Sequence, residues 1–226
     1  MERNWSVDCT PGTSREDTTL GRAHAPLDGH RGTEVADLVG DLRDGGPCLV
    51  FVGINPSLMT AATGTHFAHP SNRFYPSLHA AGLTDRQLPR GVAHTDEDAR
   101  ALTDRGIAVT NVVARATARA SDLSDAELRA GVPVLEAKLE RWRPVVVAFT
   151  GVTAYRTAFG ERDAALGLQD RDLAGAEVWV VPNPSGLNAH ETIDSLAAWY
   201  RRVAGAAGLV PHGPTRDASA VRRRGG

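Results

Sequence analysis

Four short apolar runs, separated by stretches with helical spacing, constrain the fold of this chain more than any other feature of its sequence. The runs comprise residues 48–54, 107–113, 145–149 and 178–181, and each is rich in β-branched side chains and nearly continuous. Runs of this kind are typical of strands that are covered on both faces, as in a parallel sheet. We therefore predict four buried strands.

The stretches between the runs carry helix signals. Ser124 and Glu127 have the spacing of a capping box, and apolar residues recur at helical spacing after it. Residues 192–203 carry a second apolar face of this kind. Strands that alternate with helices imply right-handed crossovers and a sheet covered by helices. We therefore predict an α/β fold: a single three-layer domain with a central, mostly parallel four-stranded sheet flanked by helices.

The length and the two ends of the chain indicate one domain between two arms. A chain of 226 residues is long enough for one α/β domain with a sizeable core and would be cramped for two. Residues 1–30 and 209–226 are polar and show no sustained hydrophobic period. We expect a flexible N-terminal arm over 1–30, the domain over 31–208 and a flexible C-terminal tail over 209–226.

Composition excludes several classes of protein. The formal net charge of −2 argues against a protein that holds nucleic acid mainly by bulk charge. No apolar run approaches the roughly 20 residues of a membrane span, and no Gly-rich phosphate loop is present. Cys9 and Cys48 cannot build a disulfide framework or a four-thiolate site. Since His66 and His69 lack a second cluster at metal-ligand spacing, we interpret them as structural histidines. We expect no metal, no cofactor and no membrane partner.

Two strands of the predicted sheet end in unusual polar turns. Asn55-Pro56-Ser57 follows the first strand, and Asn183-Pro184-Ser185-Gly186-Leu187 follows the last. Asn-Pro alone is only a turn signal. The carboxyl ends of parallel strands, however, meet at one edge of the sheet, where ligands bind in open α/β folds. The pair of turns therefore indicates a functional site at this edge.

Five short motifs follow one another between residues 48 and 203. They are Gly53-Ile54-Asn55-Pro56, then Thr63-Gly64 with Phe67-Ala68-His69-Pro70-Ser71-Asn72-Arg73-Phe74, then Gly82-Leu83-Thr84-Asp85-Arg86-Gln87-Leu88, Thr110-Asn111-Val112-Val113-Ala114-Arg115-Ala116-Thr117 and Asn183-Pro184-Ser185-Gly186-Leu187. In this order they resemble the motifs of the mismatch-specific uracil-DNA glycosylase and thymine-DNA glycosylase family. The resemblance implies a uracil-DNA glycosylase-like fold. It also implies a monofunctional enzyme that flips a base out of the duplex and hydrolyses its N-glycosidic bond.

The resemblance assigns the catalytic role to Asn55, because the asparagine of this motif positions the attacking water in the family. A carboxamide orients water but is a poor general base, since it cannot take a proton as a carboxylate can. The reaction then relies on a loose, cation-like transition state at the sugar and on stabilisation of the departing base anion.

The resemblance also implies a base pocket, made of Ile54, Thr60, Phe67, Asn111 and Thr117. Phe67 matches the aromatic residue on which the flipped base stacks, and Thr60 matches the position that touches the pyrimidine 5-edge. Because bulk there disfavours thymine, we favour uracil as substrate. Asn111 stands where one branch has lysine and the thymine-processing branch has asparagine, so the substrate range stays open. An amide at this position can hydrogen-bond the base edge.

The last motif matches the loop that the family inserts into DNA, here Asn183, Pro184, Ser185, Gly186, Leu187 and Asn188. Leu187 is expected to enter the stack where the base has left. Gly186 allows close backbone approach, and Ser185 is expected to bond a phosphate.

Two positions depart from the family pattern. Ser57 replaces the usual glycine and is expected to add a side chain beside the reacting sugar. The segment Asn188-Ala189-His190 lacks the arginine that follows the family's wedge, and Arg73 and His190 are the candidates to replace it.

The function expected from the resemblance is excision of uracil, and of other deaminated or alkylated bases, from G·U mismatches in base-excision repair. The expected partner is double-stranded DNA with a G·U mismatch or damaged base, bound by a monomer in the bacterial cytosol or nucleoid.

Other readings stay open beside this one. The first is a thymine or broad-specificity glycosylase, or another branch of the superfamily. Branches with an iron–sulfur cluster need four cysteines, which this chain lacks. The second is a non-catalytic or weakly active base-binding module of the same fold, against which Asn55 argues. The third is a structural α/β protein whose turns resemble the motifs, and the ordered match argues against it.

Overall fold

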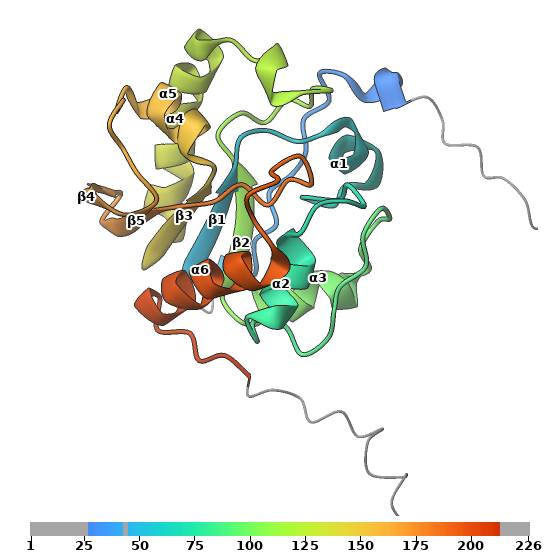
Figure 1. Ribbon diagram of the computed structural model, residues 1–226, viewed down its shortest axis with the longest axis vertical. Helices are drawn as coiled ribbons and strands as arrows, with labels where there is room; N and C mark the ends of the chain where they lie inside the picture. Colours follow the sequence, from blue (N-terminus) through green and yellow to red (C-terminus); the bar gives the residue numbers. More distant parts are fainter. Residues whose placement is uncertain (1–26, 43–44, 213–226) are drawn as a thin grey trace, which may run out of the picture.

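The strands form one five-stranded sheet in the order β2-β1-β3-β5-β4 (Figure 1). The computed structural model describes residues 27–42 and 45–212. The strands are β1 (Leu49–Gly53), β2 (Ile107–Asn111), β3 (Val146–Thr150), β4 (Gly167–Leu173) and β5 (Ala176–Val181). Pairings β2–β1, β1–β3 and β3–β5 are parallel, and every residue of β1, β2 and β3 is buried. The four predicted runs are confirmed as the parallel part of the sheet.

The prediction of four strands is wrong in number, because β4 adds an antiparallel edge strand on β5. Its sequence alternates partly exposed and fully exposed residues and contains three charged side chains, Asp170, Arg171 and Asp172. A strand that pairs on one side only needs no continuous apolar run, so a search for buried runs misses it. Ala174 and Gly175 join it to β5 with φ values of 54° and 80°, the left-handed pair that favours tight hairpins.

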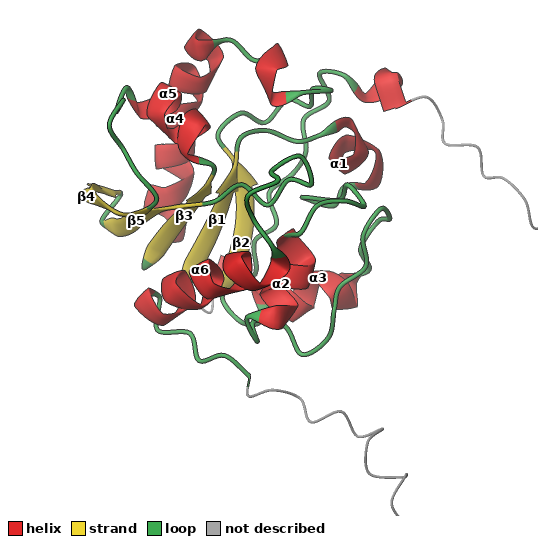
Figure 2. Cartoon of the chain, viewed as in Figure 1, coloured by secondary structure: helices red, strands yellow, loops and turns green. Residues whose placement is uncertain are grey.

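Helices cover both faces of the sheet (Figure 2). They are α1 (Leu58–Thr63), α2 (Phe74–Ala80), α3 (Asp96–Thr103), α4 (Asp125–Trp142), α5 (Val152–Phe159) and α6 (Ile193–Ala206), with the 3-10 turns η1 (Leu27–His30) and η3 (Ala120–Asp122). The predicted capping box of Ser124 and Glu127 begins α4. In the part of the chain that the structure describes, no helix is both long and apolar enough to cross a membrane.

Alternation along β1 divides the core into two layers. Leu49 and Phe51 pack in the cluster that contains Tyr200 of α6, whereas Val50 and Val52 pack in the cluster that contains Leu135 of α4. Because successive strand side chains point to opposite faces, one short strand supplies both layers. The three-layer prediction is therefore confirmed.

The segment before β1 runs antiparallel along the outer edge of β2. Leu38 and Val109 exchange backbone hydrogen bonds of 2.9 and 2.8 Å, and Gly32 and Val35 donate to carbonyls further along, at Ala116 and Ala114. Residues 1–26 of the predicted arm and 213–226 of the predicted tail lie outside the described residues. Within the described ends, His212 N–H donates to the Gly82 carbonyl over 2.8 Å.

Candidate active site

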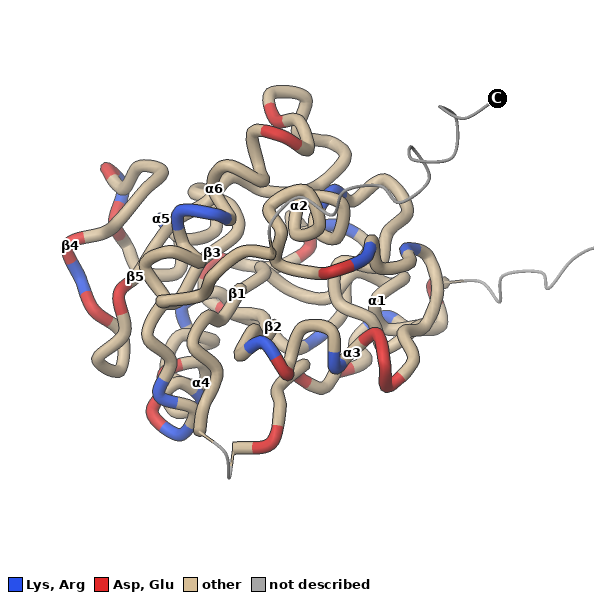
Figure 3. The backbone as a smooth tube through the Cα atoms, turned by 90° about the horizontal axis from the view of Figure 1, so that it is seen from below, with Lys and Arg blue, Asp and Glu red and all other residues tan. Residues whose placement is uncertain are grey.

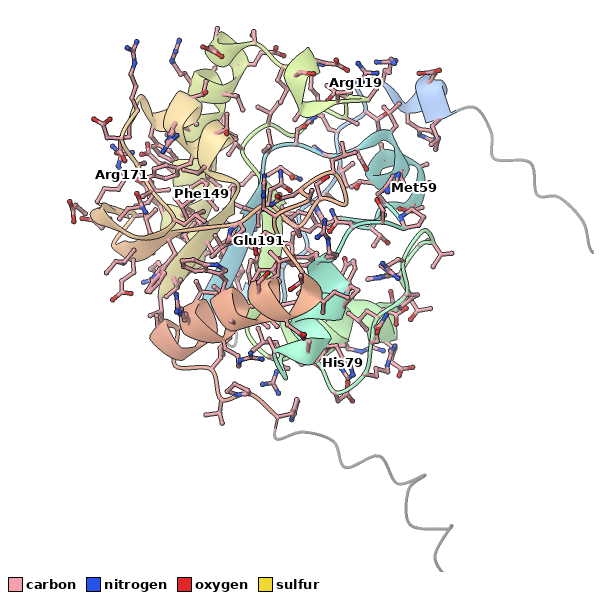
Figure 4. The ribbon with its side chains drawn as sticks, in the orientation of Figure 1. Met59, His79, Arg119, Phe149, Arg171 and Glu191 are labelled. Carbon is pink, nitrogen blue, oxygen red and sulfur yellow. The ribbon has the colours of Figure 1, made fainter. Side chains whose placement is uncertain are left out.

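Both polar turns lie at the carboxyl edge of the parallel strands. The chain leaves β1 towards α1, and the loop between β5 and α6 reaches the same side of the domain (Figure 1). Figure 4 shows Met59 on α1 at the right of the view and Glu191, just before α6, near its centre. A backbone hydrogen bond of 2.9 Å from Arg73 N–H, just before α2, to the Pro184 carbonyl ties the second motif to this loop. With the fourth motif, whose Arg115 carbonyl accepts a hydrogen bond from Asn55, four of the five motifs thus lie at this edge of the sheet.

The side-chain amide of Asn55 has one fixed orientation. Its Nδ2 donates to the Arg115 carbonyl over 3.1 Å and to Thr117 Oγ1 over 2.7 Å. A carbonyl can only accept, and the Thr117 hydroxyl gives its own hydrogen to the Arg119 carbonyl over 2.7 Å. Both hydrogens of the amide are therefore used, and Oδ1 is the atom left to accept a hydrogen bond from water.

Thr117 acts on the site through Asn55. It is 4% exposed, its amide N–H donates to the Pro56 carbonyl over 3.2 Å, and it forms a bridge with Ser57. Since its hydroxyl is used by Asn55 and Arg119, it has no hydrogen left for a base. Its place in the base pocket stays a prediction.

Ser57 caps helix α1. Its Oγ accepts a hydrogen bond from Thr60 N–H over 3.1 Å and lies 3.1 Å from Thr60 Oγ1. A serine with this extended backbone is a preferred N-cap. The hydroxyl expected beside the reacting sugar is therefore engaged within the turn. Thr60 is 2% exposed, and its contact with the 5-edge of the base stays a prediction.

Phe67 stacks on the aromatic core at the end of β1. Its ring lies 4.2 Å from that of Phe74, with an angle of 29° between the planes. Phe67 has a φ of 53°, which is rare for a bulky residue, and the Tyr75 hydroxyl fixes the adjacent backbone by donating to the His66 carbonyl over 2.7 Å. The ring therefore belongs to a rigid segment.

Gly53 gives Phe67 and Asn111 room to meet. A Cβ atom on Gly53 would lie 2.4 Å from Asn111 Oδ1 and 3.4 Å from Phe67 Cζ. The last residue of β1 must therefore be glycine if these two side chains are to lie over it. Ile54, the next residue, is half-buried against the α4 layer of the core.

Asn111 ends β2 and is paired with a buried histidine. It is 7% exposed, and its Nδ2 lies 3.2 Å from Nδ1 of His66, which is 3% exposed. The other ring nitrogen of His66, Nε2, lies 2.9 Å from the Ala36 carbonyl. The histidine is structural, as predicted, but the sequence did not reveal that its partner is a predicted pocket residue.

The loop after β5 is held by its own polar side chains. Asn183 Oδ1 accepts from Ser185 N–H over 2.9 Å, and Asn188 Nδ2 donates to the Asn183 carbonyl over 3.0 Å. Ser185 Oγ accepts from Leu187 N–H over 3.3 Å. Leu187 is 95% exposed at the end of this network. The loop thus presents one apolar side chain on a preformed support.

Arg73 supports this loop from inside. Its guanidinium donates to the carbonyls of Ser185 over 2.9 Å, Asn188 over 2.8 Å and Glu191. A planar fork with five donors is suited to binding several carbonyls at once. The expectation that Arg73 replaces the missing arginine on DNA is therefore wrong, because its guanidinium is committed to the loop. His190 is exposed and stays a candidate.

A model of the Uracil DNA glycosylase superfamily matches residues 40–204, which include the sheet, the turn after β1 and the loop after β5. The chain belongs to this superfamily. Membership makes the protein a DNA glycosylase, a hydrolase that removes uracil-like lesions in base-excision repair. The predicted superfamily is confirmed, and its mismatch-specific branch stays a prediction.

The charges of the described chain do not form one large basic surface (Figure 3). Basic and acidic positions are interspersed along the described chain (Figure 3).

Within residues 27–42 and 45–212, no three His, Cys, Asp or Glu side chains gather as a metal site. A concavity of about 820 Å³ is lined by residues 160–166 and 168–171 between α5 and β4, and it includes none of the predicted site residues.

Proposed function

We propose that this glycosylase excises uracil from G·U mismatches in duplex DNA, as a monomer and with water as its only co-reactant. The observation that carries the proposal is the fixed amide of Asn55, whose Nδ2 is bound by Arg115 and Thr117 while Oδ1 is left to hold water. A base-binding module has no use for such an arrangement.

The proposed reaction breaks the bond between the sugar C1′ and N1 of uracil, and the electron pair stays on N1. Water held by Asn55 Oδ1 adds to C1′ as positive charge develops there. The carboxamide cannot keep the water's proton, which passes to solvent. Hydrogen bonds to the departing base anion lower the barrier, because they strengthen as the charge develops.

The choice of a mismatch follows from the cost of flipping. Extrusion of a base costs a few kcal/mol and least where pairing is weak, so a G·U pair opens more readily than G·C. Leu187, exposed on a braced loop, suits an apolar wedge that fills the gap. The half-buried Phe67 offers a face for the flipped ring, and Asn111 a polar edge.

The decisive experiment compares duplexes that contain one G·U, A·U or G·T pair with single-stranded uracil, each followed by alkaline cleavage of abasic sites. We expect scission to be fastest on G·U. A protein that binds the G·U duplex tightly without scission is a base-binding module, and this outcome would contradict the proposal. Faster scission on G·T than on G·U would assign the thymine branch instead.

A Thr117→Val variant tests the water-holding arrangement directly. Valine keeps the shape of threonine but cannot accept the Asn55 hydrogen bond, so the amide loses its shortest contact and keeps only the carbonyls of Pro56 and Arg115 as acceptors. We expect excision to fall about tenfold, the equivalent of one lost hydrogen bond. Thr157→Val on α5 is the matched control, since that hydroxyl bonds only the Thr153 carbonyl.

A further inference from the structure

The pair formed by His66 and Asn111 is closed to solvent and joined to a third partner. His66 lies between the Ala36 carbonyl, 2.9 Å from Nε2, and Asn111 Nδ2, 3.2 Å from Nδ1. Both side chains are less than one tenth exposed. Water therefore does not compete for these hydrogen bonds, and each nitrogen must satisfy the partner that it faces.

The partners determine which nitrogen of His66 carries the hydrogen. A carbonyl oxygen only accepts, so Nε2 must donate to Ala36. Burial lowers the pKa of His66 and keeps the ring neutral, so Nδ1 carries no hydrogen and accepts from Asn111. Asn111 must then point Nδ2 at the ring. Its Oδ1 lies on the opposite branch of the amide, over Gly53 and beside the Phe67 ring.

The Ala36 carbonyl is itself held in place. The neighbouring Asp37 pairs with Lys138 of α4 at 2.9 Å and accepts from the Thr110 hydroxyl over 2.5 Å. One residue further on, Leu38 is hydrogen-bonded to β2 through its backbone. The acceptor that selects the His66 tautomer is thus anchored on both the sheet and α4.

We propose that His66 determines which base edge the pocket accepts, by holding Asn111 in a single amide orientation. The inference rests on the proposed function. Uracil offers an N3–H donor beside a carbonyl acceptor, so Asn111 Oδ1 accepts from N3–H while its second Nδ2 hydrogen donates to the carbonyl. Cytosine presents the reverse, an N3 acceptor beside an amino donor. Its acceptor would face Asn111 Oδ1 and its donor would face Nδ2, so neither hydrogen bond forms. His66 is a positioning residue in this arrangement, and Asn111 contacts the base.

Nitrogen NMR of the free wild-type protein tests the tautomer without any activity assay. We expect the Nε2 of His66 to be the protonated nitrogen and Nδ1 the unprotonated one at pH 7.5. Protonation at Nδ1 would overturn the inference, whatever the enzyme excises. Absence of uracil excision would overturn the proposed function and leave the tautomer result standing.

Base selectivity tests the consequence. Suitable probes are 5-fluorouracil and 5-fluorocytosine opposite guanine, because fluorine activates both leaving groups and the two rings differ in the edge that Asn111 reads. In His66→Phe the acceptor is lost and the amide can turn, so the rate ratio of the two probes should fall about tenfold, as expected for one hydrogen bond. In His66→Gln one terminal amide can donate to Ala36 and accept from Asn111, so the ratio should be retained.

The matched control is His79→Phe. This histidine bonds the Thr84 carbonyl and lies at the far end of α2 from the strand ends (Figure 4). An unchanged ratio in a folded His66→Phe protein would overturn the inference, as would an equal loss in His66→Gln. If His66→Phe fails to fold, the NMR tautomer and the His66→Gln ratio decide.

Discussion

The turn after β1 and the loop after β5 follow two strands of one sheet and differ in what their hydrogen bonds hold in place. Asn55 is held by residues about 60 positions away, at Arg115 and Thr117. The loop over 183–188 is held largely by its own side chains and by Arg73, and it leaves Leu187 almost fully exposed. The proposed chemistry requires an acceptor atom with a fixed direction, whereas the proposed insertion into DNA requires a firm support for an exposed side chain.

The largest effect that separates the two regions is expected from Asn55→Ala. Loss of the water-holding group should slow G·U excision by a factor of roughly 100 to 1,000, in the range of other single stabilising groups in enzymes. Binding to the G·U duplex should stay within about twofold, because the loop is untouched. Single-turnover excision and fluorescence anisotropy measure the two quantities, with Thr153→Ala on α5 as control. Activity equal to wild type would show that the turn does not hold the water.

Arg73→Met tests the support of the insertion loop. Three hydrogen bonds from a charged donor are lost and their carbonyls need other partners, so we expect the free energy of unfolding to fall by about 3 kcal/mol. Urea unfolding measures this loss. Arg73→Lys should not restore the stability, because an ammonium cannot reach the three carbonyls as the fork does. Full stability in Arg73→Met would place the support elsewhere.

Leu187→Ala tests the exposed end of the same loop. We expect excision from duplex G·U to fall about tenfold while excision from single-stranded uracil is unchanged, since only the duplex needs the gap filled. The unfolding free energy should stay within about 0.5 kcal/mol, because the side chain is 95% exposed. An equal loss on both substrates would assign Leu187 to the pocket instead of the wedge.

The smallest expected effect concerns pH and belongs to the chemical region. Burial lowers the pKa of His66 from its ordinary value of 6.5. Below pH 6.5, His66 is therefore protonated in the unfolded chain while it is still neutral in the folded protein. The hydrogen bond to Ala36 and the charge of Asp37 oppose this lowering of the pKa, and the charge of Lys138 adds to it. The Tyr75 hydroxyl donates to the His66 carbonyl.

Stability should therefore be fully present above pH 6.5 and fall by at most about 1.4 kcal/mol per unit of acidification, until the folded pKa is passed. Urea unfolding at pH 7.5 and 5.5 measures the fall. His66→Gln should lose less stability between these two pH values than the wild type does. An identical fall in both proteins would remove His66 as its source.

Sequence patterns predicted the parts of the molecule that repeat or that share a motif. The parallel strands follow from continuous apolar runs, and the superfamily follows from the ordered motifs. The roles that the motifs give to Asn55, Asn111 and Leu187 stay predictions. The edge strand β4 was not predicted, because about half of its residues face solvent and it therefore contains no continuous apolar run. The proposed role of His66 could not be predicted from the sequence. The residue that determines its tautomer, Ala36, lies 30 residues away and contributes only a backbone carbonyl. Arg73 was misassigned for the same reason: backbone acceptors leave no trace in sequence.

The absence of space above Gly53 has a consequence for altering the enzyme. Even the smallest added side chain there would meet Asn111 Oδ1 at 2.4 Å, so position 53 cannot be varied without moving the residue that we propose to contact the base. Libraries that aim at new lesions should therefore leave position 53 untouched and diversify the walls, at positions 60 and 111. The end of β1 then stays unchanged in every engineered variant.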